Sequence, residues 1–222
     1  PGQALVHTEH SAWDRYKMPT RVVNALTMRR SRRVFAVSRA VLASMRSSRM
    51  RRLAPLDRTE VLYHGVDLTR TVRVEEHRSE ARSSLGLGPD TRAVIMVASL
   101  TEKKDHNTLL KSFAELRNRV PGVRLCLVGG GPLEGALRAQ ARDLGLDKAV
   151  DFLGVRDDVR RILPAFDALV LPSRHEGLGL VIIEAFAAGI PVVASRVGGI
   201  PEIVGDFEGA ILVSPGNVQD LT

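Results

Sequence analysis

From residue 92 onward, short apolar runs alternate with amphipathic segments, and this alternation limits the folds open to the chain. The apolar runs predict strands at Arg92–Ser99, Val123–Gly129, Ala149–Leu153, Ala168–Pro172, Pro191–Val197 and Ala210–Ser214. The amphipathic segments predict helices at Asp105–Arg119, Leu133–Leu144, Val159–Ala165, Leu180–Ala188 and Pro201–Val204. Several strands are apolar on both faces, which is typical of a parallel sheet covered by helices on each side. We therefore predict an α/β domain with a doubly wound parallel sheet over residues 91–222.

The preceding residues give a weaker pattern. Within residues 1–70, two helical and two strand-like segments resemble the last β-α-β pieces of a second domain, too few for an independent one. We interpret them as the remnant of an amino-terminal domain. Residues 71–90 contain a helix-like, Arg-rich stretch, Val72–Leu87, followed by Gly88-Pro89, and are predicted to be a connector.

The basic side chains are concentrated in the first part of the chain. Residues 1–90 carry 17 Lys and Arg against 9 Asp and Glu, whereas residues 91–222 carry 15 against 16. The formal net charge of +7 therefore belongs to the segment outside the predicted α/β domain. The clusters Arg29–Arg33 and Arg46–Arg52 fit a polyanion-binding surface, although a solvated face is the simpler interpretation. Aromatic residues form only 4% of the chain and do not interleave with these arginines, which argues against nucleic acid as a partner.

Composition and cysteine usage exclude several other classes. With 44% hydrophobic residues the chain can bury a core, which excludes disordered and collagen-like proteins. The single cysteine, Cys126, excludes an internal disulfide and a Cys-based zinc site, and its apolar neighbours predict a buried strand position. His175 has no second ligand at metal-binding spacing, so we expect no metal. No secretory leader pattern occurs, and we expect a cytoplasmic location.

The common nucleotide-binding fingerprints are absent from the sequence. No G-x-G-x-x-G follows a predicted strand and no G-x-x-x-x-G-K-[ST] occurs, which argues against NAD-type dehydrogenases and P-loop NTPases. Gly129–Gly131 and Pro132 do end a strand and open a helix. A tight glycine turn without a ligand explains them more simply than a binding loop.

The most informative block, Ser173–Leu180, follows the predicted strand Ala168–Pro172. Its glycines at 177 and 179 allow backbone N–H groups to approach an anion, and the helix that follows adds its positive end. These features predict a phosphate site. Glu184, eight residues after Glu176, stands among apolar neighbours where an unpaired carboxylate is costly, so we predict that it binds a ligand. On a helix that begins near residue 179, both carboxylates can face the same cleft.

This block also carries a resemblance to a known family. The run Glu176–Ser195, continued by Gly198–Val204, resembles the Glu-x7-Glu signature of retaining GT-B glycosyltransferases of the glycosyl transferase group 1, or family 4, type. Further matches are Tyr63-His64-Gly65-Val66-Asp67, with His64 in place of the family Asn, Ala36-Val37-Ser38, Leu127-Val128-Gly129-Gly130-Gly131-Pro132 and Phe152-Leu153-Gly154. The resemblance covers nearly the whole chain. It implies a GT-B fold with a Rossmann-like nucleotide-sugar donor domain at residues 91–222, and it implies that most of the acceptor-side domain and a closing helix lie outside this sequence.

The resemblance assigns roles to individual positions. Glu176 would contact the donor sugar, and Glu184 would bind the ribose hydroxyls. The backbone that holds the sugar hydroxyls and the diphosphate would come from Gly177, Leu178, Gly179 and Leu180.

Other roles fall outside the signature block. Lys104 matches the family Lys that neutralises the diphosphate, whereas Ser99 stands where the family has Arg, which leaves the cationic clamp incomplete. The backbone at Val155 and Arg156 would hold the nucleobase. His7 matches the His of the amino-terminal domain that lies over the reacting sugar.

The function implied by the resemblance is transfer of a sugar from a nucleotide-diphosphate sugar to an unidentified acceptor, with retention of configuration and without a metal or other cofactor. The acceptor is a glycan, a lipid or a small molecule. A nucleotide-sugar epimerase or a phosphorylase of the same fold remains an alternative, as does a non-catalytic module that binds polyanions or membranes. An Arg-rich surface that faces anionic lipid would place the protein at the inner face of the membrane.

Overall fold

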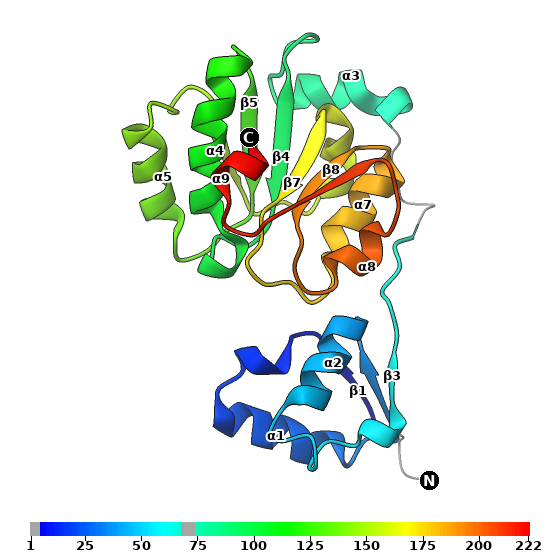
Figure 1. Ribbon diagram of the computed structural model, residues 1–222. Helices are drawn as coiled ribbons and strands as arrows, with labels where there is room; N and C mark the ends of the chain where they lie inside the picture. The colour runs from blue at the N-terminus through cyan, green and yellow to red at the C-terminus, as the bar shows by residue number, and fades with distance from the viewer. Residues whose placement is uncertain (1–4, 68–73) are drawn as a thin grey trace. The chain divides into compact units, whose positions relative to one another are not determined.

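The computed structural model describes residues 5–67 and 74–222, which divide into two compact units (Figure 1). Unit 1 contains the chain up to Gly65 together with Glu176–Gly179 and Val197–Gly205. Unit 2 contains Val66–His175, Leu180–Arg196 and Asp206–Thr222.

Unit 2 is built on a six-stranded parallel sheet, as the alternation of apolar runs predicts. Its strands are β4 (Ala93–Val97), β5 (Arg124–Val128), β6 (Val150–Gly154), β7 (Ala168–Leu171), β8 (Val192–Ser195) and β9 (Ala210–Val213). Each of these strands begins and ends within two residues of its predicted bounds, and β4, β5, β7 and β8 have buried apolar residues at their centres. The strand order is β6-β5-β4-β7-β8-β9, which confirms the doubly wound, Rossmann-like arrangement.

Unit 2 contains six α-helices among its described residues, of which α4, α5, α6 and α7 follow strands in the predicted positions. They are α3 (Val74–Ser84), α4 (His106–Arg119), α5 (Glu134–Asp143), α6 (Val159–Ile162), α7 (Leu180–Ala188) and α9 (Val218–Leu221). Figure 1 shows α4 and α5 to the left of the strands and α3 and α7 to the right. This separation follows from right-handed crossovers, since the chain moves outward from β4 to β6 and then in the opposite direction from β7 to β9. Among the described residues, no helix is long and apolar enough to cross a membrane.

The strand order creates a switch point between β4 and β7. These two strands are neighbours, with Val94 beside Ala168 and Ile95 beside Leu169. The chain leaves their carboxyl ends in opposite directions, so the loops after β4 and β7 border a crevice at one edge of the sheet. Ligands of open α/β sheets bind at such a crevice, and the Ser173–Leu180 block lies in the loop after β7.

The helix α3 occupies most of the stretch predicted to be a connector. Arg78 pairs with Asp167 at 2.6 Å, and Arg82 donates to the carbonyl of Ala165 at 2.8 Å. The two arginines thus fix α3 against the segment that precedes β7, and the helix is part of unit 2. The first residues of the predicted connector, 71–73, lie outside the described residues.

Unit 1 contains a smaller parallel sheet of three strands in the order β1-β2-β3. Its elements are β1 (Val6–Glu9), α1 (Met18–Met28), β2 (Arg33–Ala36), α2 (Arg39–Ser47), β3 (Thr59–Val61) and α8 (Ile200–Val204). The strand β1 was not predicted, because its four residues alternate weakly and its partner β2 lies far along the chain.

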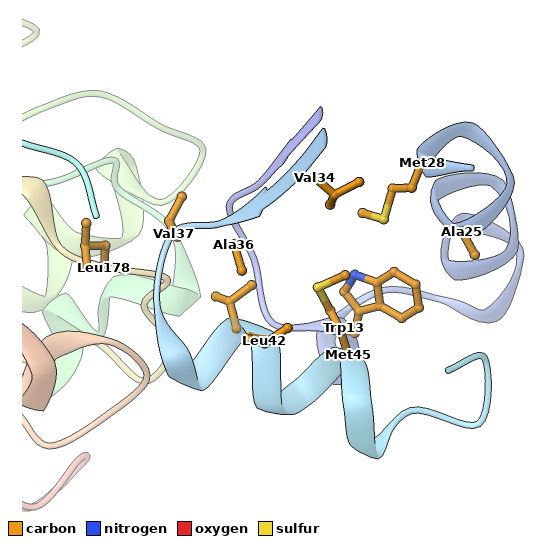
Figure 2. Packing of buried hydrophobic residues seen from close by; sticks show 10 residues of the cluster. Trp13, Ala25, Met28, Val34, Ala36, Val37, Leu42, Met45 and Leu178 are labelled. Carbon is orange, nitrogen blue, oxygen red and sulfur yellow. The ribbon is translucent and has the colours of Figure 1, made fainter. Parts of the chain in front are cut away.

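The core of unit 1 gathers around Trp13, which is fully buried (Figure 2). Met28 from α1 and Met45 from α2 belong to the same cluster. The Trp13 indole donates to the carboxylate of the buried Glu9 at 3.0 Å, and the Tyr16 hydroxyl donates to it at 2.8 Å. A buried carboxylate is tolerated only with such partners. Burial also raises the pKa of Tyr16 above its ordinary value.

The amino-terminal end of α2 is satisfied by two acceptors. The Ser38 hydroxyl accepts from the backbone N–H of Val41 at 3.2 Å. The carboxylate of Glu202, on α8, accepts from the backbone N–H groups of Arg39 at 2.7 Å and Ala40 at 2.8 Å. These groups have no partner inside a helix, and the helix dipole favours a negative charge there. Glu202 thereby fastens α8 to α2.

Candidate functional site

The predicted site residues divide between the two units. Unit 2 contains those on the loops after β4 and β6 and on α7, namely Ser99, Lys104, Val155, Arg156, Leu180 and Glu184. Because the carboxyl ends of parallel strands share one edge of a sheet, the fold brings these loops to the same edge. Unit 1 contains His7, Glu176, Gly177, Leu178 and Gly179.

Glu184 lies at an open pocket of about 620 Å³ within unit 2. The lining residues come from the end of β4, the loop after β6 with α6, and α7, and they are Val97, Asp157, Asp158, Val159, Arg160, Arg161 and Glu184. Arg160 donates from Nε to a carboxylate oxygen of Glu184 at 3.1 Å. The sequence predicts that Glu184 binds a ligand, because an unpaired carboxylate among apolar residues is costly, and the structure gives this carboxylate a partner within the protein, Arg160. The pocket has the size expected for a small-molecule site.

The loop after β6 is held by one ion pair. Arg156 donates from two nitrogens to both carboxylate oxygens of Asp158, at 2.8 and 2.6 Å. This bidentate contact lowers the pKa of Asp158 and raises that of Arg156. Val155, next to the pair, is 83% exposed. The pair therefore fixes the loop while its outer face stays open to a ligand.

Glycines bring the loops after β4 and β5 close together. A side chain at Gly129 would collide with the carbonyl of Ala98, and one at Gly131 with the carbonyl of Leu100. Gly129 also has a positive φ of 137°. Glycine is therefore required at positions 129 and 131 by backbone packing within the protein.

Lys104 ends a short 3₁₀ helix, Glu102–Lys104, in the loop after β4. The next residue, Asp105, is in the left-handed conformation with φ of 54° and begins the turn into α4. The hydroxyl of Ser99 lies 3.5 Å from that of Thr101. The lysine thus stands at the loop that borders the switch point.

The Glu176–Gly179 block is fixed by close backbone contacts inside unit 1. A side chain at Gly177 would collide with the carbonyl of His10, and one at Gly198 with the carbonyl of Glu176. Leu178 is 4% exposed and belongs to the hydrophobic cluster of unit 1, where Val37 is the labelled side chain nearest to it in Figure 2. Gly177 is predicted to present its N–H group to an anion. The structure gives a second reason for glycine here, because a side chain would collide with the His10 carbonyl.

The structure draws attention to a histidine that the sequence did not single out. His7 lies inside β1, beside Val34 of β2. His10 follows β1 at its carboxyl end, where its carbonyl meets Gly177 and its ring stacks on His64 with centroids 5.3 Å apart. His10 could have been found from the sequence, because ligands bind beyond the carboxyl ends of parallel strands and His10 directly follows β1. It was missed because β1 itself was not predicted.

Two further observations concern metal binding and the location of the site. Within residues 5–67 and 74–222, no group of three or more His, Cys, Asp or Glu side chains is placed to hold a metal ion. A second cavity, of about 660 Å³, lies at the opposite end of the sheet, where its lining includes Asp90–Arg92 before β4 and Arg119–Gly122 before β5. Open α/β sheets bind ligands at the carboxyl ends of their strands, which favours the pocket at Glu184.

The fold of the chain is that of the GT-B glycosyltransferases, to which its structural neighbours belong. The crystal structure of Anabaena Alr3699/HepE in complex with UDP and glucose is similar with a TM-score of 0.85 and 28% identity, over 99% of this chain and 60% of that one. The sucrose-phosphate synthase of Thermosynechococcus elongatus is similar with a TM-score of 0.81 and 28% identity, over 97% of this chain and 56% of that one.

The chain belongs to the family of glycosyl transferases group 1, whose family model matches residues 77–222. A GDP-mannose-dependent alpha-(1-6)-phosphatidylinositol monomannoside mannosyltransferase of Mycolicibacterium smegmatis is 37% identical over 174 residues, which cover 73% of this chain and 45% of that protein. A D-inositol 3-phosphate glycosyltransferase of Actinosynnema mirum is 38% identical over 170 residues, which cover 70% of this chain and 40% of that protein. The chain spans less than half the length of these two relatives.

Proposed function

We propose that the protein transfers a sugar from a nucleotide-diphosphate sugar to an acceptor with retention of configuration. One observation carries the proposal: in a chain of this family, Glu184 lines a pocket beside the switch point of the sheet. The names of its relatives support a nucleotide-sugar donor, since one is GDP-mannose-dependent and a similar solved structure contains UDP and glucose.

In this proposal the pocket at Glu184 receives the nucleoside. The carboxylate of Glu184 accepts hydrogen bonds from the ribose hydroxyls while Arg160 holds its other side. The exposed backbone at Val155 and Arg156 contacts the base, supported by the pair between Arg156 and Asp158. The family resemblance gives Glu176 the contact with the donor sugar.

The chemistry asks mainly for charge stabilisation and positioning. The bond between the sugar and the diphosphate breaks through an oxocarbenium-like state, and negative charge grows on the leaving diphosphate. Lys104 and the amino-terminal end of α7 are the groups proposed to stabilise that charge. The acceptor attacks from the same face, which retains the configuration without a covalent intermediate on a carboxylate. This route employs no metal or other cofactor. Two histidines are candidates to face the reacting sugar: His7, by the family resemblance, and His10, by its position at the carboxyl end of β1.

Two substitutions test the proposal in the full-length protein. We expect Glu184→Ala to weaken nucleotide-diphosphate binding at least tenfold, because the ribose contact is lost, and Lys104→Ala to slow sugar transfer at least tenfold. Glu208→Ala and Lys111→Ala, which change exposed residues outside the pocket, are the matched controls. Normal transfer kinetics in both test variants would falsify the residue assignment.

The same assay separates the alternative reactions. A transferase consumes donor in step with acceptor, whereas an epimerase converts the donor without one, and a phosphorylase requires inorganic phosphate. The anomeric configuration of the product, read by proton NMR, tests retention directly. An inverted product would overturn the retaining mechanism while leaving the transferase assignment in place.

We also propose that unit 1 contacts an anionic membrane surface. The exposed face of α1 carries Val23 and Leu26, which are 57% and 49% exposed, and the exposed Arg29 and Arg30 follow the helix. Apolar and basic side chains side by side are typical of helices that bind the lipid interface. Binding to vesicles that contain phosphatidylglycerol, weakened by salt and by replacement of both arginines with Gln, is the expected result. Equal binding to neutral vesicles would contradict it.

A further inference from the structure

The loops after β4 and β7 are joined across the switch point by their backbones. The N–H of Arg174 donates to the carbonyl of Lys103 at 2.8 Å. This bond connects the residue before Lys104 to the loop that leads into Glu176. Strands β4 and β7 are neighbours in the sheet, so the bond extends their pairing into the loops.

An ion pair between the exposed Arg174 and the buried Asp105 reinforces the same junction. The Asp105 side chain is 2% exposed, and its carboxylate accepts from Arg174 Nε at 2.8 Å and Nη2 at 3.3 Å. The Thr108 hydroxyl donates to it at 2.9 Å. A carboxylate this deeply buried is stable only when its oxygens are satisfied, and Arg174 supplies the compensating charge.

Asp105 is also the one non-glycine residue with positive φ in the part of the chain that the structure describes. The left-handed conformation costs a side-chain-bearing residue free energy, and it persists where the surroundings dictate it. Glycine would adopt this conformation without cost. The Asp105 carboxylate has two uses: it caps α4 by accepting from the backbone N–H of Thr108 at 3.4 Å, and it pairs with Arg174.

We infer that Asp105 and Arg174 are positioning residues, which hold the Lys104 loop against the first part of the loop after β7, residues 172–175, and so place Lys104 for the donor diphosphate. The inference rests on the proposed function, since it concerns the donor site. The two side chains neutralise each other, so their contribution is geometric, and the charge that meets the diphosphate comes from Lys104. Loss of either side chain frees both loops while the nucleoside pocket, built from other loops, stays intact.

The test compares diphosphates with monophosphates. Dissociation constants for UDP, UMP, GDP and GMP are measured by calorimetry for the chain and for Asp105→Gly, Arg174→Gln and Arg174→Lys. Asp105→Gly removes the carboxylate and relieves the backbone at the same time, but it also removes the cap of α4, whereas the Arg174 variants leave that cap in place and change only the pair. Arg78→Gln, which breaks the pair with Asp167 at the other end of the sheet, is the matched control.

We expect the preference for diphosphate over monophosphate to fall at least tenfold in Asp105→Gly and Arg174→Gln, with monophosphate affinity within twofold of the unaltered chain. Arg174→Lys keeps the positive charge but loses the contact through two nitrogens, so its preference for diphosphate should fall as it does in Arg174→Gln. The double variant should lose no more than either single one, because the pair acts as a unit. Arg78→Gln should leave the preference unchanged.

Three results would overturn the inference. An unchanged preference in Asp105→Gly and Arg174→Gln, in a chain that itself prefers diphosphates, rejects the positioning role and leaves the donor site standing. An equal loss of monophosphate and diphosphate affinity indicates a general structural role and also rejects it. An unaltered chain that binds none of the four nucleotides overturns the proposed donor site and the inference together.

Discussion

His106, the first residue of α4, is 2% exposed, and neither ring nitrogen has a hydrogen-bond partner among the described residues. Burial lowers its pKa from 6.5 to about 4, and the nearby Lys104 adds to the effect. The unfolded chain therefore binds a proton in a pH range where the folded chain does not. The stability that depends on a neutral His106 is present above pH 6.5, the ordinary pKa, and is lost as the pH falls toward 4, the pKa in the folded chain.

We expect His106→Leu to remove this acid-linked loss, which amounts to roughly 3 kcal/mol of unfolding free energy between pH 7 and pH 4. Urea unfolding at both pH values measures it. His77→Gln changes an exposed histidine on α3 and serves as the control. A His106→Leu variant whose stability falls with pH as steeply as that of the unaltered chain would contradict the assignment.

Single residues were predictable where the sequence around them is informative. Glu184 stands among apolar neighbours, so its need for a partner was evident, and Cys126 is 2% exposed in β5 as its neighbours predicted. The partner Arg160 was not predictable, because it lies on another helix and many arginines compete for the role. The left-handed conformation of Asp105 was not predicted, because Asp adopts it more often than most residues but is far more common in other conformations.

At the scale of elements, the contact between Glu202 and α2 can be tested alone. We expect Glu202→Gln to destabilise unit 1 by about 1 kcal/mol, because the charged acceptor at the helix start is lost. Hydrogen exchange of the Arg39 and Ala40 amides, together with urea unfolding, measures the effect. In Glu208→Gln, which changes an exposed loop residue, these amides should exchange as before. Unaltered exchange in Glu202→Gln would show that the contact contributes little.

The predicted elements were reliable where several apolar residues follow one another. All six strands of the larger sheet were identified, because apolar residues predominate in each, and in β4, β5, β7 and β8 most of these residues are buried. The elements β1 and α9 were not, since each has only four residues and depends on distant partners. The predicted helix Val159–Ala165 is divided into α6 and a 3₁₀ turn, Leu163–Ala165, in which Pro164 interrupts α-helical hydrogen bonding.

For the whole molecule, the sequence indicated the larger α/β unit but not the composition of the smaller one. Leu178 and Glu202 belong to unit 1 although the strands on either side of them belong to unit 2. Both assignments arise from contacts with residues more than 100 positions earlier. A pattern read along the chain does not reveal such contacts, because neither residue differs from an ordinary loop or helix residue in its local surroundings.

This division of the chain has a consequence for exchanging parts between relatives. A chimaera that replaces only residues 1–65 leaves Leu178 and Glu202 facing foreign neighbours, whereas one that also transfers residues 176–179 and 197–205 keeps unit 1 whole. We expect only the second kind to melt at a temperature close to that of its parents, as differential scanning calorimetry would show. In evolutionary terms, unit 1 is inherited as three separated segments, so a single recombination breakpoint at residue 65 divides it.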